Sequence, residues 1–167
     1  RGWLGYGGAK MQDKAKSDLK ESFLWGCEYE KDHLIDNHPL RGINIWPEFQ
    51  PNLKTAAMKY FNYADKLARN LMRGFALGLN LESNFFLKTC DNPLSRASLV
   101  YYPNQPSELG DDQYGVSAHT DFGVLTVLCQ DDVGGLQIQD INGDWFHAPP
   151  IKDTIIVNVA DLLSRWT

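Results

Sequence analysis

The sequence predicts an α+β fold with a mainly β core, in which short strands form a sandwich or barrel and helices pack outside it. Two observations support this prediction. A helical pattern dominates the chain before residue 95, and short segments rich in β-branched and aromatic residues follow it, separated by Gly, Pro, Asn and Asp. With 167 residues the chain is long enough for one domain with a buried core, or for part of a larger one.

The first half of the chain is predicted to hold one long helix. The first 50 residues, glycine-rich near their start, predict loops and short helices around a later core. From Leu53 to Phe75 apolar residues recur every three or four positions, which is the spacing of one face of an amphipathic helix. Pro51 suits the first turn of this helix, and Gly78 with Asn80 marks its end.

After a shorter helix expected over 85–88, the pattern becomes that of a β protein. Five segments predict strands: Ser98–Tyr102, Val124–Cys129, Leu136–Gln139, Trp145–His147 and Thr154–Val159. Asn142 and Gly143 lie between two of these segments. Because an Asn-Gly pair accepts the positive φ of a type I′ turn, a tight hairpin is expected there.

Composition and charge exclude several classes of protein. The chain is 43% hydrophobic and 22% charged, as ordinary globular proteins are, and its apolar runs are too short for a membrane span. Residues 98–167 hold two basic residues against ten acidic ones, which disfavours a nucleic-acid partner. Three cysteines without a CxxC pair, and no signal-peptide pattern at the start, favour a reducing, cytoplasmic location without a membrane partner.

His119-Thr120-Asp121 is the strongest candidate for chemistry. In a strand, residues i and i+2 point to the same face, so one strand is expected to present both side chains to one metal ion. One His and one carboxylate are two members of the 2-His-1-carboxylate triad, which leaves positions on iron(II) open for co-substrate and dioxygen. A His-x-Asp pattern alone is a weak signal, and the alternative is a solvated pair at a strand end.

A longer run around this motif, from Gly115 to Ile138, resembles the iron-binding strand and following turn of the isopenicillin N synthase-like oxygenases. Five other segments resemble further signatures of that family, in the family's order: Asp18–Phe23, Asn44–Pro47, Tyr101–Pro103, Gly143–Pro150 and Ile155–Thr167. The resemblance therefore spans nearly all 167 residues.

The resemblance implies a double-stranded β-helix (a jelly roll) with buttressing helices. It implies one incomplete oxygenase domain over residues 1–167, with a helical and loop support region over 1–95 and the first part of the jelly-roll core over 96–167. The implied function is that of a non-haem Fe(II) dioxygenase. Such an enzyme uses 2-oxoglutarate and O2 to hydroxylate, desaturate or cyclise a small organic substrate, with formation of succinate and CO2.

The resemblance also implies roles for four residues. His119 and Asp121 become iron ligands and catalytic residues, and Tyr102 is expected to help hold the far carboxylate of 2-oxoglutarate. Asp161 is similar to a family aspartate near the end of a strand and is expected to hydrogen-bond backbone.

The family's distal His, the third iron ligand, and its arginine for 2-oxoglutarate are expected beyond Thr167, together with the C-terminal strands. The favoured interpretation is therefore a fragment of a complete enzyme, inactive by itself, with sheet edges and apolar surface left exposed. The alternatives are an iron oxidase of the same family that does not use 2-oxoglutarate, and a truncated, non-catalytic jelly-roll binding module. Neither the primary substrate nor the oligomeric state is predicted.

Overall fold

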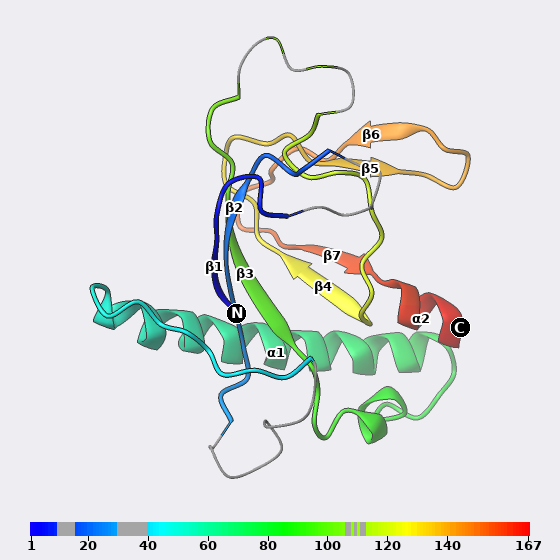
Figure 1. The fold of residues 1–167 in the computed structure, drawn as a ribbon. Helices are drawn as coiled ribbons and strands as arrows, with labels where there is room; N and C mark the ends of the chain where they lie inside the picture. The colour runs from blue at the N-terminus through cyan, green and yellow to red at the C-terminus, as the bar shows by residue number, and fades with distance from the viewer. Residues whose placement is uncertain (10–15, 30–39, 106–107, 109, 111–112) are drawn as a thin grey trace. The chain divides into compact units, whose positions relative to one another are not determined.

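A computed structural model of the protein describes residues 1–9, 16–29, 40–105, 108, 110 and 113–167 (Figure 1). These residues form two compact units, Arg1–His119 and Thr120–Thr167. None of the helices in these ranges combines the length and the apolar character that a membrane span requires.

The first unit contains a three-stranded antiparallel sheet in the order β1-β2-β3. Its strands are β1 (Gly2–Leu4), β2 (Glu21–Gly26) and β3 (Arg96–Tyr101), and β2 pairs with β3 along its whole length. The prediction of loops and short helices for the first 50 residues is therefore wrong at β1 and β2, which are strands. Those predictions also covered residues 10–15 and 30–39, which lie outside the described residues.

The long helix α1 (Pro51–Gly78) begins and ends where the sequence predicts. Asn80 follows it with φ of 58°, the left-handed conformation that ends many helices. Ala57 and Phe61 on α1 form a buried core with Trp25 of β2, which is 1% exposed, so the helix packs on the sheet of its own unit. The predicted short helix is present as the 3-10 helix η1 (Phe86–Thr89).

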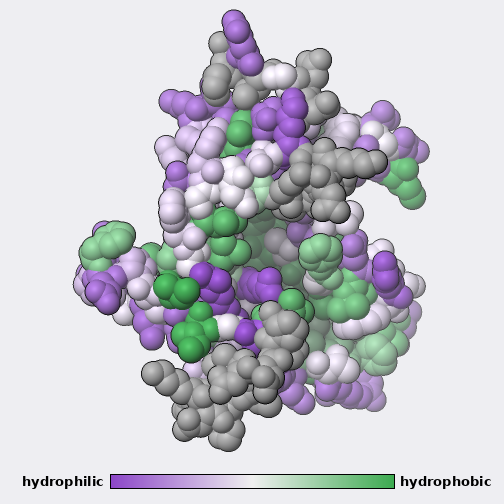
Figure 2. Space-filling view, viewed as in Figure 1, coloured by the Kyte–Doolittle hydropathy of each residue, from purple (hydrophilic) through white to green (hydrophobic). Residues whose placement is uncertain are grey.

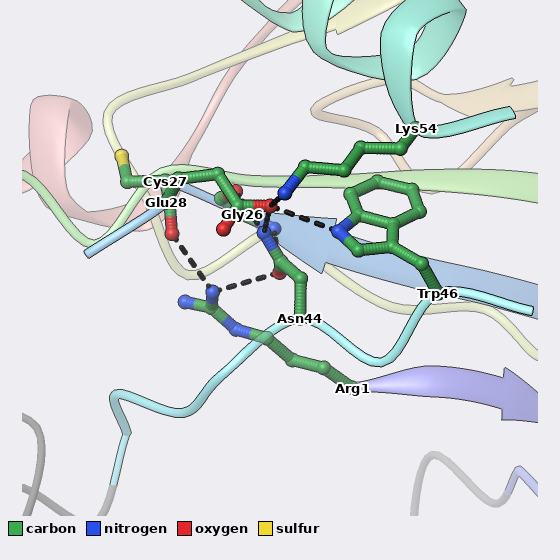
Figure 3. A network of polar contacts seen from close by, with 7 residues as sticks. All are labelled: Arg1, Gly26, Cys27, Glu28, Asn44, Trp46 and Lys54. Atoms are coloured by element: carbon green, nitrogen blue, oxygen red, sulfur yellow. Dashed lines mark hydrogen bonds and ion pairs between the residues drawn. The ribbon is translucent and has the colours of Figure 1, made fainter. Parts of the chain in front are cut away.

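A polar network fixes the end of β2 (Figure 3). Asn44 binds both backbone groups of Gly26: its Oδ1 accepts the N–H at 2.9 Å, and its Nδ2 donates to the C=O at 2.9 Å. Its Nδ2 also donates to Glu28 Oε1 at 3.1 Å, and the Trp46 indole donates to the same oxygen at 2.8 Å. Asn44 thus replaces a neighbouring strand where the ladder ends, which satisfies backbone groups that would otherwise be buried without partners.

The second unit contains two antiparallel pairs, β4 (Leu125–Leu128) with β7 (Ile156–Val159) and β5 (Gln137–Gln139) with β6 (Trp145–His147). All four lie within segments that the sequence predicts as strands. The segment 155–167, which resembles strands of the family, is only partly strand, because the short helix α2 (Asp161–Trp166) follows β7.

The predicted hairpin is present between β5 and β6, but the predicted type I′ turn is wrong. Of the two central residues, only Gly143 has a positive φ, of 92°. The carboxylate of Asp140 accepts the N–H groups of Asn142 at 2.8 Å and Asp144 at 2.9 Å. The Asp140 side chain accepts hydrogen bonds from the backbone that follows it, as in an Asx turn. The loop that forms in this way is wider than a two-residue turn.

Apolar side chains are exposed among polar ones on the molecular surface (Figure 2). In β3, Leu99 is 53% and Tyr101 is 63% exposed, and in β6 Trp145 and Phe146 are also exposed. Leu99 and Tyr101 lie two residues apart and so share one face of β3, and an apolar strand face of this kind is the surface that a second layer covers in a β-sandwich.

Candidate functional site

The segment 119–121 is not a strand, which corrects the prediction that His119 and Asp121 lie on one strand. It is a connection with a bend at 122–124, and the ladder with β7 begins only at Leu125. The reason is that its backbone is bound elsewhere. The C=O of Asp121 accepts the N–H of Asp161 at 2.9 Å, so the start of α2 occupies the place of a partner strand.

His119 is the last residue of the first unit, and its imidazole is exposed. Its Nδ1 lies 2.8 Å from the carbonyl oxygen of Ser117. Because a carbonyl oxygen can only accept a hydrogen bond, Nδ1 must carry the proton in this contact. In the neutral ring the lone pair is then on Nε2, the atom through which such an imidazole binds a metal ion.

Asp121 belongs to the second unit and is half-buried. Next to it, the Thr120 hydroxyl donates to Asp161 Oδ2 at 3.0 Å. The prediction that the Asp161 side chain hydrogen-bonds backbone is therefore wrong, because its carboxylate accepts from a side-chain hydroxyl. The backbone contact of Asp161 is made by its own N–H, which donates to the Asp121 carbonyl. Both contacts fix the backbone on either side of the Asp121 Cα atom.

The donor set of His119 and Asp121 suits iron(II). Covalent geometry keeps the Cα atoms of residues i and i+2 within about 7 Å of each other. One imidazole nitrogen and one carboxylate oxygen are donors that non-haem iron uses. The described part of the chain contains no group of three His, Cys, Asp or Glu side chains that could hold a metal ion. Two such residues do not by themselves complete a 2-His-1-carboxylate triad, which takes a second His.

Tyr102 follows the last residue of β3 and is 51% exposed. Its ring lies against Gly115, where an added Cβ would come within 2.9 Å of the ring, so a larger residue at 115 would require the ring to shift. Partial burial, and after it the negative charge of Asp18, raise the pKa of the Tyr102 phenol. The phenol therefore keeps its proton near neutral pH and can donate a hydrogen bond to a carboxylate.

Asp18 is a functional candidate that the sequence reasoning missed. Its side chain is fully buried, and it accepts the N–H of Ser117 at 2.9 Å across 99 positions of sequence. The one available signal was the Asp18–Phe23 segment, which resembles a signature of the family but suggested no role for its first residue.

Comparison with known proteins identifies the chain's relatives. Residues 95–167 match the family model of the 2OG-Fe(II) oxygenase superfamily. All of the chain aligns at 36% identity with 52% of a probable iron/ascorbate oxidoreductase of Dictyostelium discoideum. Across 92% of the chain and 49% of the relative, it is 35% identical to a homoarginine-6-hydroxylase of Glycine max. The chain thus spans about half the length of the curated relatives it matches.

Solved structures agree with this assignment. The crystal structure of a full-length Neurospora crassa protein in complex with alpha-KG superposes with a TM-score of 0.83 at 32% identity, over 99% of this chain and 54% of that one. The same Neurospora crassa protein in complex with alpha-KG and thymine gives a TM-score of 0.82 at 31% identity, over 99% and 53%.

These likenesses confirm the predicted jelly-roll class and the resemblance on which it rested. Residues 95–167 belong to the 2OG-Fe(II) oxygenase superfamily, whose model they match.

Proposed function

We propose that this chain contributes His119 and Asp121 to the iron site of a 2-oxoglutarate-dependent dioxygenase that oxidises a small organic molecule. The observation that carries the proposal is the contact of His119 Nδ1 with the Ser117 carbonyl, which places the lone pair on Nε2 two residues before a carboxylate. Membership of the superfamily and relatives named as hydroxylase and oxidoreductase support it.

Each of the chain's residues would have a distinct task. The Nε2 atom of His119 and the carboxylate of Asp121 bind iron(II), and a third ligand comes from outside the described residues. The Tyr102 phenol donates a hydrogen bond to the distal carboxylate of 2-oxoglutarate. Bound iron, with 2-oxoglutarate and dioxygen, supplies the oxidising chemistry that releases succinate and CO2.

Residues 98–167 are strongly acidic, so binding of the 2-oxoglutarate dianion there needs a basic partner. Residues 98–167 hold ten acidic side chains against Lys152 and Arg165, which is a poor environment for a dianion. We therefore expect a guanidinium from outside residues 98–167 to pair with 2-oxoglutarate, because a bidentate Arg–carboxylate pair is the usual solution.

For the substrate we propose only a class of molecule, and for the reaction we leave three outcomes open. The Neurospora crassa protein forms a complex with thymine, and the Glycine max relative is named for homoarginine, so a small polar organic molecule fits both relatives. Hydroxylation, desaturation and cyclisation are all open to this chemistry, and product analysis distinguishes them.

Iron-linked thermal stability of the whole gene product tests the proposal. A ligand that binds only the folded state stabilises it, so anaerobic Fe(II) should raise the melting temperature of the wild type. His119→Ala and Asp121→Ala should abolish this increase. The matched controls His147→Ala and Asp132→Ala, which change exposed residues of the same types, should retain it.

Succinate formation separates the remaining alternatives. Iron binding without consumption of 2-oxoglutarate would support an iron oxidase that does not use this co-substrate. Iron binding without any turnover would support a non-catalytic binding module. An undiminished iron effect in Asp121→Ala would overturn the proposed site itself.

A further inference from the structure

Asp18 is a buried carboxylate whose contacts lead to His119. Its side chain has 0% exposure, and its Oδ1 accepts the Ser117 N–H at 2.9 Å. The Ser117 C=O in turn accepts from His119 Nδ1 at 2.8 Å. Both polar backbone atoms of one residue are therefore in use, one bound to Asp18 and the other to the imidazole.

Neighbouring contacts fix the two segments to each other. The N–H of Leu19 donates to the Tyr114 carbonyl at 3.0 Å, and Gln113 Nε2 donates to the Ser17 carbonyl at 2.6 Å. The bond from Asp18 is the one that reaches the residue next but one to His119. The bond from Asp18 fixes the orientation of the Ser117 backbone. The other two bonds hold the segment around Asp18 beside residues 113 and 114 and do not contact Ser117.

The Ser117 N–H and the Lys20 ammonium together keep the buried carboxylate charged. Its Nζ lies 3.0 Å from Asp18 Oδ2 without the alignment of a hydrogen bond, so the contact is an ion pair, and Lys20 is itself only 9% exposed. Burial by itself would raise the pKa of Asp18. The Ser117 N–H and the Lys20 ammonium outweigh burial and hold that pKa below its usual value.

We infer that Asp18 is a positioning residue for the iron site: by holding the Ser117 backbone it keeps the Ser117 carbonyl on His119 Nδ1 and thereby keeps the metal-binding lone pair on Nε2. This inference rests on the proposed function, because it takes His119 as an iron ligand. Groups that orient a metal-binding imidazole through its second nitrogen commonly change metal affinity about 10–100-fold when they are removed.

Two double variants separate the effect of the hydrogen-bond acceptor at position 18 from the effect of the charge of the Asp18–Lys20 pair. Asp18→Asn with Lys20→Met keeps a side-chain oxygen for the Ser117 N–H, whereas Asp18→Leu with Lys20→Met removes it. Neither contains a buried charge, and Asn and Leu are of similar shape. The two proteins therefore differ chiefly in one hydrogen-bond acceptor.

The readouts are the tautomer of His119 and the affinity for iron. In the whole apo gene product with 15N-labelled histidine, NMR should show the His119 proton on Nδ1 in the wild type and in the Asn double variant. The His119 signals are assigned by their loss in His119→Gln. The Leu double variant should show a mixture of tautomers, and in anaerobic titration it should bind Fe(II) about 10–100-fold more weakly than the Asn double variant.

Two results would overturn the inference. One is a wild-type His119 with its proton on Nε2, a measurement that stands even where the Leu double variant fails to fold. The other is equal tautomer populations and equal Fe(II) affinity in the two double variants. If His119→Ala binds Fe(II) as the wild type does, the proposed function fails as well, and this control tells the two failures apart.

Discussion

Asp18 and Asp161 each hold one end of the segment from Ser117 to Asp121, and they do so in opposite surroundings. Asp18 is fully buried and binds the Ser117 N–H, with Lys20 as its ion-pair partner. Asp161 binds the Thr120 hydroxyl in an exposed contact, where water can replace either partner. A hydrogen bond to a buried charge is worth more than an exposed one, because its loss leaves a group without solvent. The His119 end should therefore be more rigidly fixed than the Asp121 end.

The largest effect is expected from removing one partner of the buried pair. Asp18→Leu leaves Lys20 buried without a counter-charge, which should lower the free energy of unfolding by about 3–5 kcal/mol. Urea denaturation of the whole gene product measures it. Adding Lys20→Met should restore much of the loss, because the uncompensated charge is then gone. A loss under about 1 kcal/mol for Asp18→Leu alone, the size of an ordinary hydrogen bond, would mean that the Asp18 end is no stronger than the Asp161 end.

The next effect concerns Tyr102, which lies in the same unit as Asp18 and packs on Gly115. Tyr102→Phe would remove the proposed hydrogen bond to the 2-oxoglutarate carboxylate, worth about 1.5–3 kcal/mol, so the apparent constant for 2-oxoglutarate should rise. Iron affinity should stay near the wild-type value. Steady-state kinetics with varied 2-oxoglutarate measures the first and anaerobic titration the second. An unchanged constant for 2-oxoglutarate would leave Tyr102 a structural aromatic.

A smaller effect is expected at Asp161. Asp161→Ala removes the acceptor for the Thr120 hydroxyl but keeps the N–H that binds the Asp121 carbonyl. The free energy of unfolding should fall by about 0.5–1.5 kcal/mol, toward the low end because the bond is exposed. Thr120→Val removes the same bond from its other side and serves as the matched variant. A loss as large as that of Asp18→Leu would abolish the contrast between the two ends.

The smallest expected effect is a pH dependence of the free energy of unfolding, caused by Asp18. Because the pKa of folded Asp18 is lowered below its usual value, its charge stabilises the fold above about pH 4 and this contribution is lost as pH falls further. The difference in unfolding free energy between wild type and Asp18→Asn should therefore shrink below about pH 4. Denaturant titrations from about pH 3 to neutral pH, a range that spans the usual pKa of an Asp, measure it. A difference that grows with acid would contradict the ion pair.

Local signals made parts of this fold predictable. Pro51 and Gly78 mark the ends of α1 because a proline and a glycine act on the backbone of their own turn. The strands of the second unit were predicted because β-branched residues and turn residues alternate there. His119 and Asp121 were found as candidates because a His and a carboxylate, two residue types that commonly bind iron, lie in one short motif.

Non-local contacts made other parts unpredictable. β2 forms by pairing with β3, which lies far from it in the sequence; Glu21, for example, pairs with Tyr101. Its neighbours in sequence gave no sign of this pairing. The same holds for Asp18, whose partner Ser117 lies 99 positions away. The strand expected over 119–121 is absent because the N–H of Asp161 binds there, a contact between segments far apart in the chain.

The central claim is that His119 and Asp121 hold catalytic iron, and succinate formation by the Asp121→Ala protein tests it most directly. The whole gene product is supplied with Fe(II), 2-oxoglutarate, O2 and candidate small substrates, beside the Asp132→Ala control. Wild type and Asp132→Ala should form succinate, and Asp121→Ala should form none above background while remaining folded. Wild-type succinate formation by Asp121→Ala would contradict the assignment of this pair as iron ligands.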